Sequence, residues 1–133
     1  METYTEAYRY LDNAKEILRS KAKKRGKFYN DIKYVRMACN TGYSGLLVAL
    51  DDFFRTKGIK MPPQKGKRKQ AVSVDFYKQN LAKLNKTKLK EFNSAYSYLH
   101  LYGGYDGDLL VDTSKNGLEL AQSIIDWIDK QMN

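Results

Sequence analysis

Residues 34–54 read YVRMACNTGYSGLLVALDDFF, and this stretch decides the fold. Its apolar side chains cover more than one face of a helical projection, which predicts a central helix from about residue 31 to residue 57. Four small residues repeat along it at helical spacing, although an interior glycine costs about 1 kcal/mol relative to alanine. We infer that a neighbouring helix packs too closely for larger side chains; the alternative is that the glycines are incidental in a long helix. The four residues are Ala38, Gly42, Gly45 and Ala49.

A first helix precedes the central one. Thr3 and Glu6 have the spacing of a capping box, and the apolar residues behind them alternate in steps of three and four as far as about Lys24. Gly26 is expected to stop this helix, because glycine readily adopts the left-handed conformation found at helix ends. The basic residues of the last turns suit the negative end of the helix dipole.

Two more helices follow a basic linker. Ser73 is the expected cap of a third helix, which we expect to break near Asn85 and to end at the two glycines of residues 103–104. Asp112 or Thr113 is the expected cap of the last helix, whose apolar residues again alternate by three and four.

The fold class predicted from these segments is all-α, an up-down-up-down four-helix bundle with a broken third helix. Only residues 109–111 suggest the two-residue alternation of a strand, and we expect these apolar residues to cover one end of the bundle. A chain of 133 residues is predicted to form one domain, residues 1–133.

Basic residues outnumber acidic ones by 24 to 15, and the net charge of +9 favours solubility and attraction to phosphate. Much of this charge lies in two clusters, at residues 21–27 and 57–69, and neither contains interleaved aromatic residues. A solvated surface is the ordinary interpretation of such clusters, and weak, salt-sensitive binding of nucleic acid is the functional one. The candidate nucleic-acid-binding residues are Lys23, Lys24, Arg25, Lys65, Lys67, Arg68 and Lys69.

Several classes of protein fit the composition poorly. The longest apolar run, residues 46–50, is far shorter than the ~18 residues of a membrane span, and residues 1–10 lack the apolar core of a signal peptide. We therefore expect a cytoplasmic protein without membrane contact. The single cysteine, Cys39, has no partner for a disulfide and is expected in the core. Asp106 and Asp108 alone are a weak signal for a cation, so we predict neither a metal nor a cofactor.

The chain's only histidine, His100, lies in residues 95–108, AYSYLHLYGGYDGD. Histidine can act as a general acid or base near neutral pH, and the surrounding tyrosines could stack on nucleobases. The structural alternative is a helix end, where a half-buried His100 bonds to a carbonyl or carboxylate and the glycines supply a turn. The tyrosines would then be amphipathic residues at the edge of the core, namely Tyr96, Tyr98, Tyr102 and Tyr105.

The helix order, the central stretch and the segment YLHLYGGYDG resemble the HEPN superfamily, the higher eukaryotes and prokaryotes nucleotide-binding domain. More narrowly, the chain looks like a group of small bacterial proteins of that type. Active members are RNases with four to six residues between an arginine and a histidine, and often a tyrosine two residues after the histidine. His100 and Tyr102 match the second half of this motif. The positions for the arginine hold the uncharged residues Asn93, Ser94 and Ala95.

The expected function is therefore a non-catalytic HEPN-like binding or interaction module. Its resemblance implies a homodimer, and the broad apolar circumference of the central helix is consistent with one. Two alternatives stay open. One is an atypical ribonuclease in which His100 moves a proton and a cation from elsewhere, such as Arg36, stabilises the charge on phosphate. The other is a protein partner of a nucleotidyltransferase in a toxin–antitoxin-like pair, which the resemblance allows through Tyr102.

Overall fold

The protein is described by a computed structural model over residues 2–62 and 73–132, with the side chains of residues 2–5 outside the description. The predicted cap Thr3 is one of those side chains. Most described residues are helical and only two strands of two residues occur among them, which confirms the all-α prediction. In chain order the elements are α1 (Glu2–Ile17), the π-helical segment η1 (Leu18–Ala22), β1 (Lys24–Arg25), β2 (Phe28–Tyr29), α2 (Ile32–Thr56), α3 (Val74–Leu84), α4 (Lys86–Ala95), the π-helical segment η2 (Tyr96–Tyr105) and α5 (Val111–Met132).

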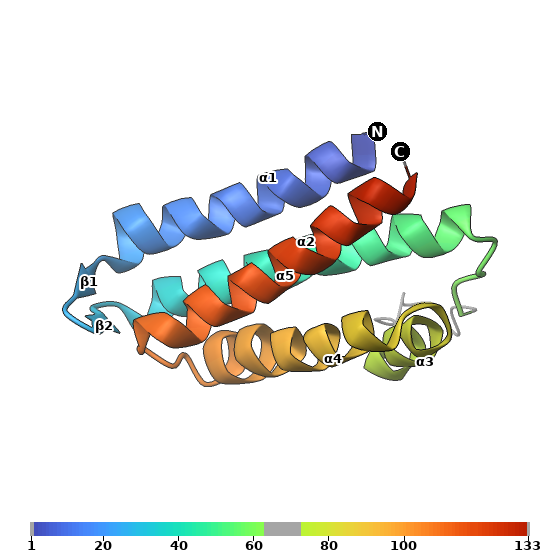
Figure 1. The fold of residues 1–133 in the computed structure, drawn as a ribbon. Coiled ribbons are helices and arrows are strands. Elements are labelled where there is room, and N and C mark those ends of the chain that lie inside the picture. The colour runs from blue at the N-terminus through green and yellow to red at the C-terminus, as the bar shows by residue number, and fades with distance from the viewer. Residues whose placement is uncertain (1, 63–72, 133) are drawn as a thin grey trace, which may run out of the picture.

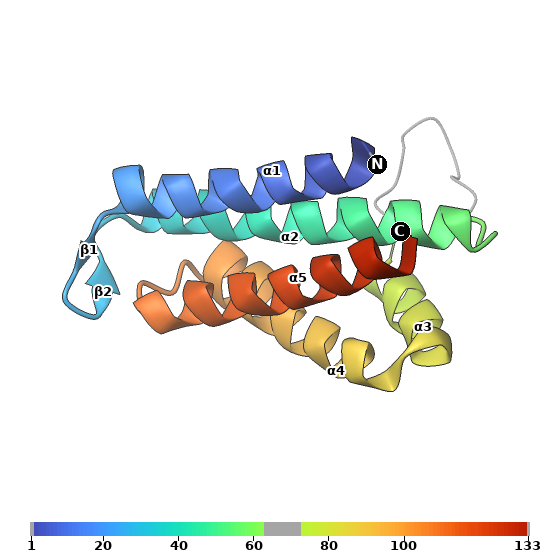
Figure 2. The same ribbon diagram turned by 45° about the horizontal axis from the view of Figure 1, so that its top comes forward.

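The central helix of the sequence analysis is α2, and its predicted ends are confirmed. Asp31 caps its start, because its side chain accepts a hydrogen bond of 3.0 Å from the Lys33 backbone N–H. Gly58 follows its last turn with a φ of +76°. Helix α1 runs beside α2 in the opposite direction, and α5 and the α4–η2 segment cover the rest of α2 (Figures 1 and 2).

The close packing predicted at the small residues of α2 is also confirmed. A Cβ atom on Gly45 would lie 2.5 Å from the Tyr10 Cβ and 3.1 Å from the Ala7 carbonyl oxygen, so α1 leaves no room there. A Cβ on Gly42 would lie 2.5 Å from a Leu118 methyl group of α5. Glycines in the middle of α2 therefore permit the approach of two neighbouring helices.

The third helical stretch breaks where the sequence predicts. Ser73 caps α3 through a hydrogen bond of 3.2 Å from the Asp75 backbone N–H. Asn85 ends α3 and caps α4, accepting a hydrogen bond of 3.0 Å from the Lys88 N–H. The two short helices meet at this break, so α3 turns away from the line of α4 (Figure 2).

The predicted helix end at Gly103 and Gly104 is wrong. Both glycines lie inside η2, which continues to Tyr105, and the positive φ of +69° occurs at Gly107. The two glycines are buried against α2, where a Cβ on Gly103 would overlap Cys39 and one on Gly104 would overlap Asn40. Because these glycines lack a side chain, η2 can pack closely on α2. The turn is made three residues after Gly104, at Gly107.

A two-stranded antiparallel hairpin between η1 and α2 was not predicted. β1 and β2 pair Lys24 with Tyr29 and Arg25 with Phe28, around Gly26 with a φ of +64°. The first helical stretch consequently ends at Ala22, just before the predicted Lys24. The hairpin is extended by residues 109–111, since the Tyr29 N–H donates to the Leu109 carbonyl at 2.8 Å. These residues do cover one end of the molecule, as expected.

The last helix begins at Val111, so Asp112 and Thr113 lie inside it and do not cap it as predicted. Asp108 organises this start instead, accepting hydrogen bonds from the Leu110 N–H at 3.0 Å and the Thr113 hydroxyl at 2.8 Å. The carboxylate suggested as a weak cation ligand is thus used to hold the turn.

The core lies between α1, α2, α5 and the α4–η2 segment. Its largest fully buried side chains include Phe53, Phe54 and Phe92, and Cys39 is fully buried as predicted. Burial raises the pKa of the Cys39 thiol to about 12, which keeps it neutral and unreactive at physiological pH. Within residues 2–62 and 73–132, no helix combines the length and apolar content needed to cross a membrane.

Candidate functional site

The segment η2 places His100 on the surface. Its ring centre lies 5.0 Å from that of Tyr43 on α2 and 5.1 Å from that of Tyr96, so it stacks on Tyr96 and packs at a tilt against Tyr43. His100 is exposed and makes no hydrogen bond with the described residues, which overturns the expectation of a half-buried, hydrogen-bonded histidine. These contacts place the imidazole in an aromatic layer on α2 that consists of Tyr43, Tyr96 and His100.

The arginine proposed to complete a site with His100 lies elsewhere. Arg36 lies beside Gly107, where a Cβ would come within 3.0 Å of the Arg36 Nε atom. Tyr43, whose ring contacts His100, follows Arg36 by seven residues, or roughly 10 Å along the axis of α2. The structure shows no contact between Arg36 and His100 among the described residues.

A cation that the sequence analysis overlooked does reach the aromatic layer. The Lys78 ammonium of α3 lies 5.1 Å from the centre of the Tyr96 ring, in a cation–π contact. Lys78 and His100 therefore share Tyr96. Lys78 precedes His100 by 22 positions in the chain. The bend at Asn85 between α3 and α4 brings the Lys78 ammonium to the Tyr96 ring.

The second member of the half-motif, Tyr102, does not join His100. Residues two positions apart on a helix face different sides, and Tyr102 instead contacts Tyr98 edge-on at 6.1 Å between ring centres. Tyr102 and Tyr105 are exposed, whereas Tyr96 and Tyr98 are half-buried. The expectation that the four tyrosines edge the core is therefore correct for Tyr96 and Tyr98.

The basic residues predicted to bind nucleic acid fall into two groups. Lys23, Lys24 and Arg25 are exposed at and beside the hairpin, which presents them at one end of the molecule. The other four lie outside the described residues, and they are Lys65, Lys67, Arg68 and Lys69.

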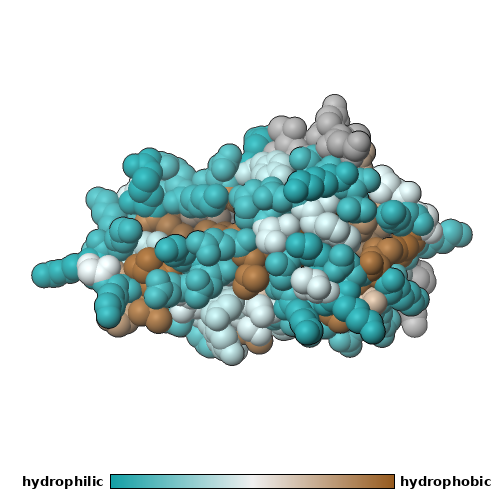
Figure 3. Space-filling model, viewed as in Figure 1, coloured by the Kyte–Doolittle hydropathy of each residue, from teal (hydrophilic) through white to brown (hydrophobic). Residues whose placement is uncertain are grey.

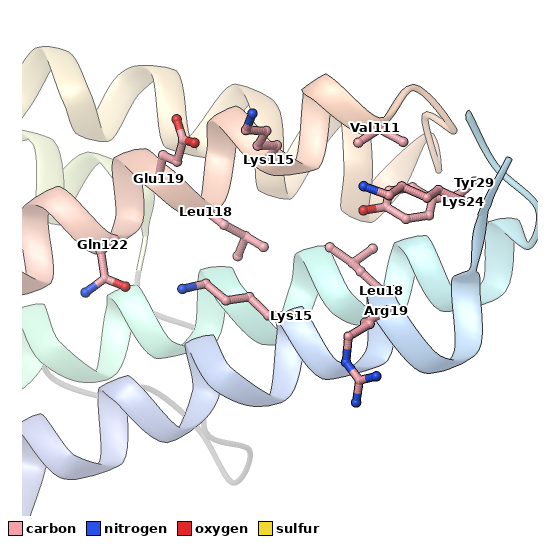
Figure 4. Close-up of a pocket in the computed structure, with 10 residues that line it drawn as sticks. All are labelled: Lys15, Leu18, Arg19, Lys24, Tyr29, Val111, Lys115, Leu118, Glu119 and Gln122. Carbon is pink, nitrogen blue, oxygen red and sulfur yellow. The ribbon is translucent and has the colours of Figure 1, made fainter. Parts of the chain in front are cut away.

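A groove between α1 and α5 is the candidate site that the fold itself creates. Its volume is about 520 Å³, within the range of ligand pockets in proteins. Its floor is apolar, formed by Leu18 of η1 and by Val111 and Leu118 of α5, with the Tyr29 ring of the hairpin beside them. Figure 4 shows Lys15 extending between α1 and α5 toward Leu118.

Hydrogen bonds tie the elements on the two sides of the groove together near each of its ends. A hydrogen bond of 2.6 Å from the Tyr8 hydroxyl to Asp126 joins α1 to α5, and Gln122, which lines the groove, donates to the same carboxylate at 2.9 Å. At the other end the hairpin is held to the start of α5 by the bond from Tyr29 to Leu109. Between these two ties α1 follows α2, so a space remains beside α5.

The groove is predominantly positive. Lys15, Lys24 and Lys115 line it and form no ion pair with the described residues, and the only carboxylate among the lining residues is Glu119. Arg19 lines it too, but its guanidinium is paired with Glu16 at 2.6 Å and points away from the groove (Figure 4). The brown floor between teal rims is visible from outside in Figure 3.

Tyr29 adds a polar group to the apolar floor. Burial raises the pKa of its phenol above the ordinary 10.0, against a smaller lowering by a hydrogen bond with Ser114, so the hydroxyl is protonated at physiological pH. In the described part of the chain, no cluster of three or more histidine, cysteine or acidic side chains is arranged to hold a metal ion. The groove is thus suited to binding an anion directly through protein donors.

Comparison with known proteins places this geometry in a family. The model of the family "Domain of unknown function (DUF5618)" matches residues 2–130. The chain belongs to this family. A solved structure of a protein of unknown function from Dyadobacter fermentans is also similar, with 42% identity, a TM-score of 0.85, and coverage of 99% of this chain and 97% of that chain. No curated protein matches the chain.

The groove could not be found from the sequence, because its lining comes from residues 15 to 122 and from five separate elements. None of these residues belongs to a recognisable motif. The nearest signal was the basic cluster at residues 21–27, which contains Lys24. Tyr29 follows this basic cluster by two residues, so the sequence itself shows an aromatic ring next to the cluster.

Proposed function

We propose that this protein is a non-catalytic binding module built on a HEPN-like, up-down-up-down four-helix bundle, and that it acts as a homodimer. The observation that carries the proposal is the environment of His100. Cleavage of RNA by a histidine also requires positive charge fixed near the phosphate oxygens. Arg36 is about two helical turns away along α2, and the Lys78 ammonium is held against the ring of Tyr96.

The arrangement of helices supports the HEPN-like bundle. The α1, α2, α4–η2 and α5 rods alternate in direction, as Figure 1 shows, and each packs on at least two of the others. The segment that resembles the superfamily motif lies in η2 against the central helix. Its glycines pack against α2, its exposed histidine packs on Tyr43 and Tyr96, and its last residues form a turn. These structural roles account for the same residues without catalysis.

The proposed dimer rests on exposed apolar side chains. Most of α2 is covered by other helices, so its circumference no longer supports a dimer as the sequence suggested. Large exposed apolar residues gather instead near the hairpin, the start of α2 and the end of η2, where Tyr105 is 78% exposed and Phe28 is 54% exposed. Such surfaces commonly mark interfaces. Sedimentation equilibrium at micromolar concentration tests this part, and a monomer there would contradict it.

The decisive test of non-catalysis is incubation of the purified protein with single-stranded RNA, in parallel with the variants His100→Ala, Arg36→Ala and Lys78→Ala. We expect no cleavage above a buffer control. Cleavage by the wild type that disappears in His100→Ala and in either cation variant, with unchanged circular dichroism, would establish the ribonuclease alternative. Equal weak cleavage by all four proteins would indicate a contaminating nuclease. That result would support the proposal that the protein itself does not cleave RNA.

A further inference from the structure

We propose that the groove between α1 and α5 binds a single amphipathic anion, a small molecule with an aliphatic or aromatic body and a terminal phosphate or carboxylate. This inference rests on the proposed function, since it assigns a ligand class to the binding module. The body would lie on Leu18 and Leu118, and the anionic end would meet the Lys24 ammonium, which extends from the hairpin end of the groove, while Lys15 adds positive charge nearer Gln122 (Figure 4).

The shape of the groove favours a small ligand over a polymer. The Tyr8–Asp126 hydrogen bond ties α1 to α5 beyond Gln122, and Lys24 and Tyr29 of the hairpin line the opposite end, so the groove is bounded in length. An extended nucleic-acid strand needs an open channel and successive stacking rings, whereas Tyr29 is the one aromatic side chain that lines this groove among residues 2–62 and 73–132. The volume of about 520 Å³ accommodates a small organic molecule.

The charge of the groove selects an anion. In the described part of the chain, three lysines without an ion-pair partner and one paired arginine line it, against the single carboxylate of Glu119. An ammonium group beside an apolar floor attracts an anion more strongly than one fully surrounded by water, because the local dielectric is lower. An amphipathic ligand would satisfy the floor and the lysines together.

The experiment uses the full chain and octyl phosphate below its micelle concentration, followed by isothermal titration calorimetry. Inorganic phosphate and octyl glucoside provide the anionic end and the apolar body separately. The groove variant carries Lys15→Glu and Lys24→Glu. The matched control carries Lys83→Glu and Lys90→Glu, which change two exposed lysines on α3 and α4 by the same charge.

We expect octyl phosphate to bind the wild type at least tenfold more tightly than either partial probe. The groove variant should weaken this binding at least tenfold, while the control should stay within about threefold of the wild type. Equal loss in both variants would overturn the proposal, because it would show attraction to net charge alone. Binding only to vesicles of phosphatidylglycerol, or no binding of octyl phosphate, would also overturn it.

The outcome separates this inference from the proposed function. Absence of octyl phosphate binding, together with absence of RNA cleavage, would reject the ligand class and leave the non-catalytic module standing. Cleavage of RNA that depends on His100 would reject the proposed function, whatever happens in the groove. Because the variants replace exposed lysines, circular dichroism is expected to show them folded, and a melting temperature within a few degrees of the wild type confirms that the binding data can be compared.

Discussion

The contact between η2 and α2 differs from the groove between α1 and α5 in how closely the helices approach. Glycines bring η2 against α2 until a Cβ on Gly103 would lie only 2.9 Å from the Cys39 Cβ. Helix α1 instead reaches α5 through the hydrogen bond from Tyr8 to Asp126, and a groove of about 520 Å³ remains.

This difference distinguishes the motif-like residues of η2, which are used for packing, from the groove residues, which are accessible to a ligand. The η2 segment contains the histidine, the tyrosines and the glycines that suggest a motif, yet they are used largely for packing. The groove is lined by ordinary lysines and leucines whose side chains are left accessible by the fold. A binding site therefore follows from where packing is incomplete, as well as from which residues are chemically distinctive.

The largest effect is expected where the packing is tightest. Gly103→Ala should lower the free energy of unfolding by about 3 kcal/mol, because the added methyl group overlaps Cys39 and also approaches the Tyr98 carbonyl oxygen. Asn93→Ala, on the exposed face of α4, is the control and should change it by less than about 0.5 kcal/mol. Urea denaturation measures both.

A double variant sharpens the same test. Cys39→Ala removes the sulfur atom from the contact, so it should recover part of the stability lost in Gly103→Ala. If Gly103→Ala alone leaves the urea midpoint unchanged, the claim of a tightly packed η2 is wrong.

Two buried tyrosines of the core, Tyr43 on α2 and Tyr77 on α3, give the next effect, which depends on pH. Burial raises the folded-state pKa values of Tyr43 and Tyr77 above the ordinary value of 10.0. Their contribution to stability is complete below pH 10 and is lost as the pH rises further, since only the unfolded chain then releases these protons. Each phenol should cost about 1.4 kcal/mol of stability per pH unit in that range.

Tyr43→Phe isolates one of these phenols. Melting temperatures from pH 9 to pH 11.5 should fall less steeply in this variant than in the wild type. Identical slopes would mean that the Tyr43 phenol ionises as readily in the folded protein as in the unfolded chain, and that the packed region is more open to water than the structure shows.

A smaller effect is expected for His100→Ala. The exposed imidazole packs against the rings of Tyr43 and Tyr96, so its removal should cost about 1 kcal/mol. The predicted order is Gly103→Ala well above His100→Ala in a single urea series. A His100→Ala variant less stable than Gly103→Ala would show that the histidine has a larger structural role than its exposed position indicates.

The smallest effect is expected in the groove. Replacing both Lys15 and Lys24 by alanine should change the free energy of unfolding by less than about 0.5 kcal/mol, because neither lysine has an ion-pair partner among the described residues. Thermal unfolding without ligand tests this prediction. A loss above about 1 kcal/mol would show that these lysines stabilise the fold and are not free for a ligand.

Local sequence signals predicted the helices well. The bounds of the central helix, at about residues 31 and 57, and the break near Asn85 depend on signals from neighbouring residues, so they could be predicted from the sequence. The hairpin was missed because strands of two residues, Lys24–Arg25 and Phe28–Tyr29, are too short to show an alternating pattern.

Features that depend on distant parts of the chain were not predictable. Gly103 and Gly104 resemble a helix end, and only the approach of Cys39 and Asn40, some 64 positions earlier, reveals that they are packing residues. The start of α5 was placed at Asp112 or Thr113 for a similar reason, since the side chain that organises it belongs to Asp108 in the preceding turn. The groove needed the complete arrangement of α1, the hairpin and α5.

The central claim is that ligands bind between α1 and α5 and not at His100. Titration of ¹⁵N-labelled protein with octyl phosphate, followed by amide chemical shifts, tests it most directly. The account predicts saturable shifts in residues 15–29 and 111–122, with the amides of residues 96–105 little changed. Shifts concentrated in residues 96–105, and absent from the two groove segments, would contradict it.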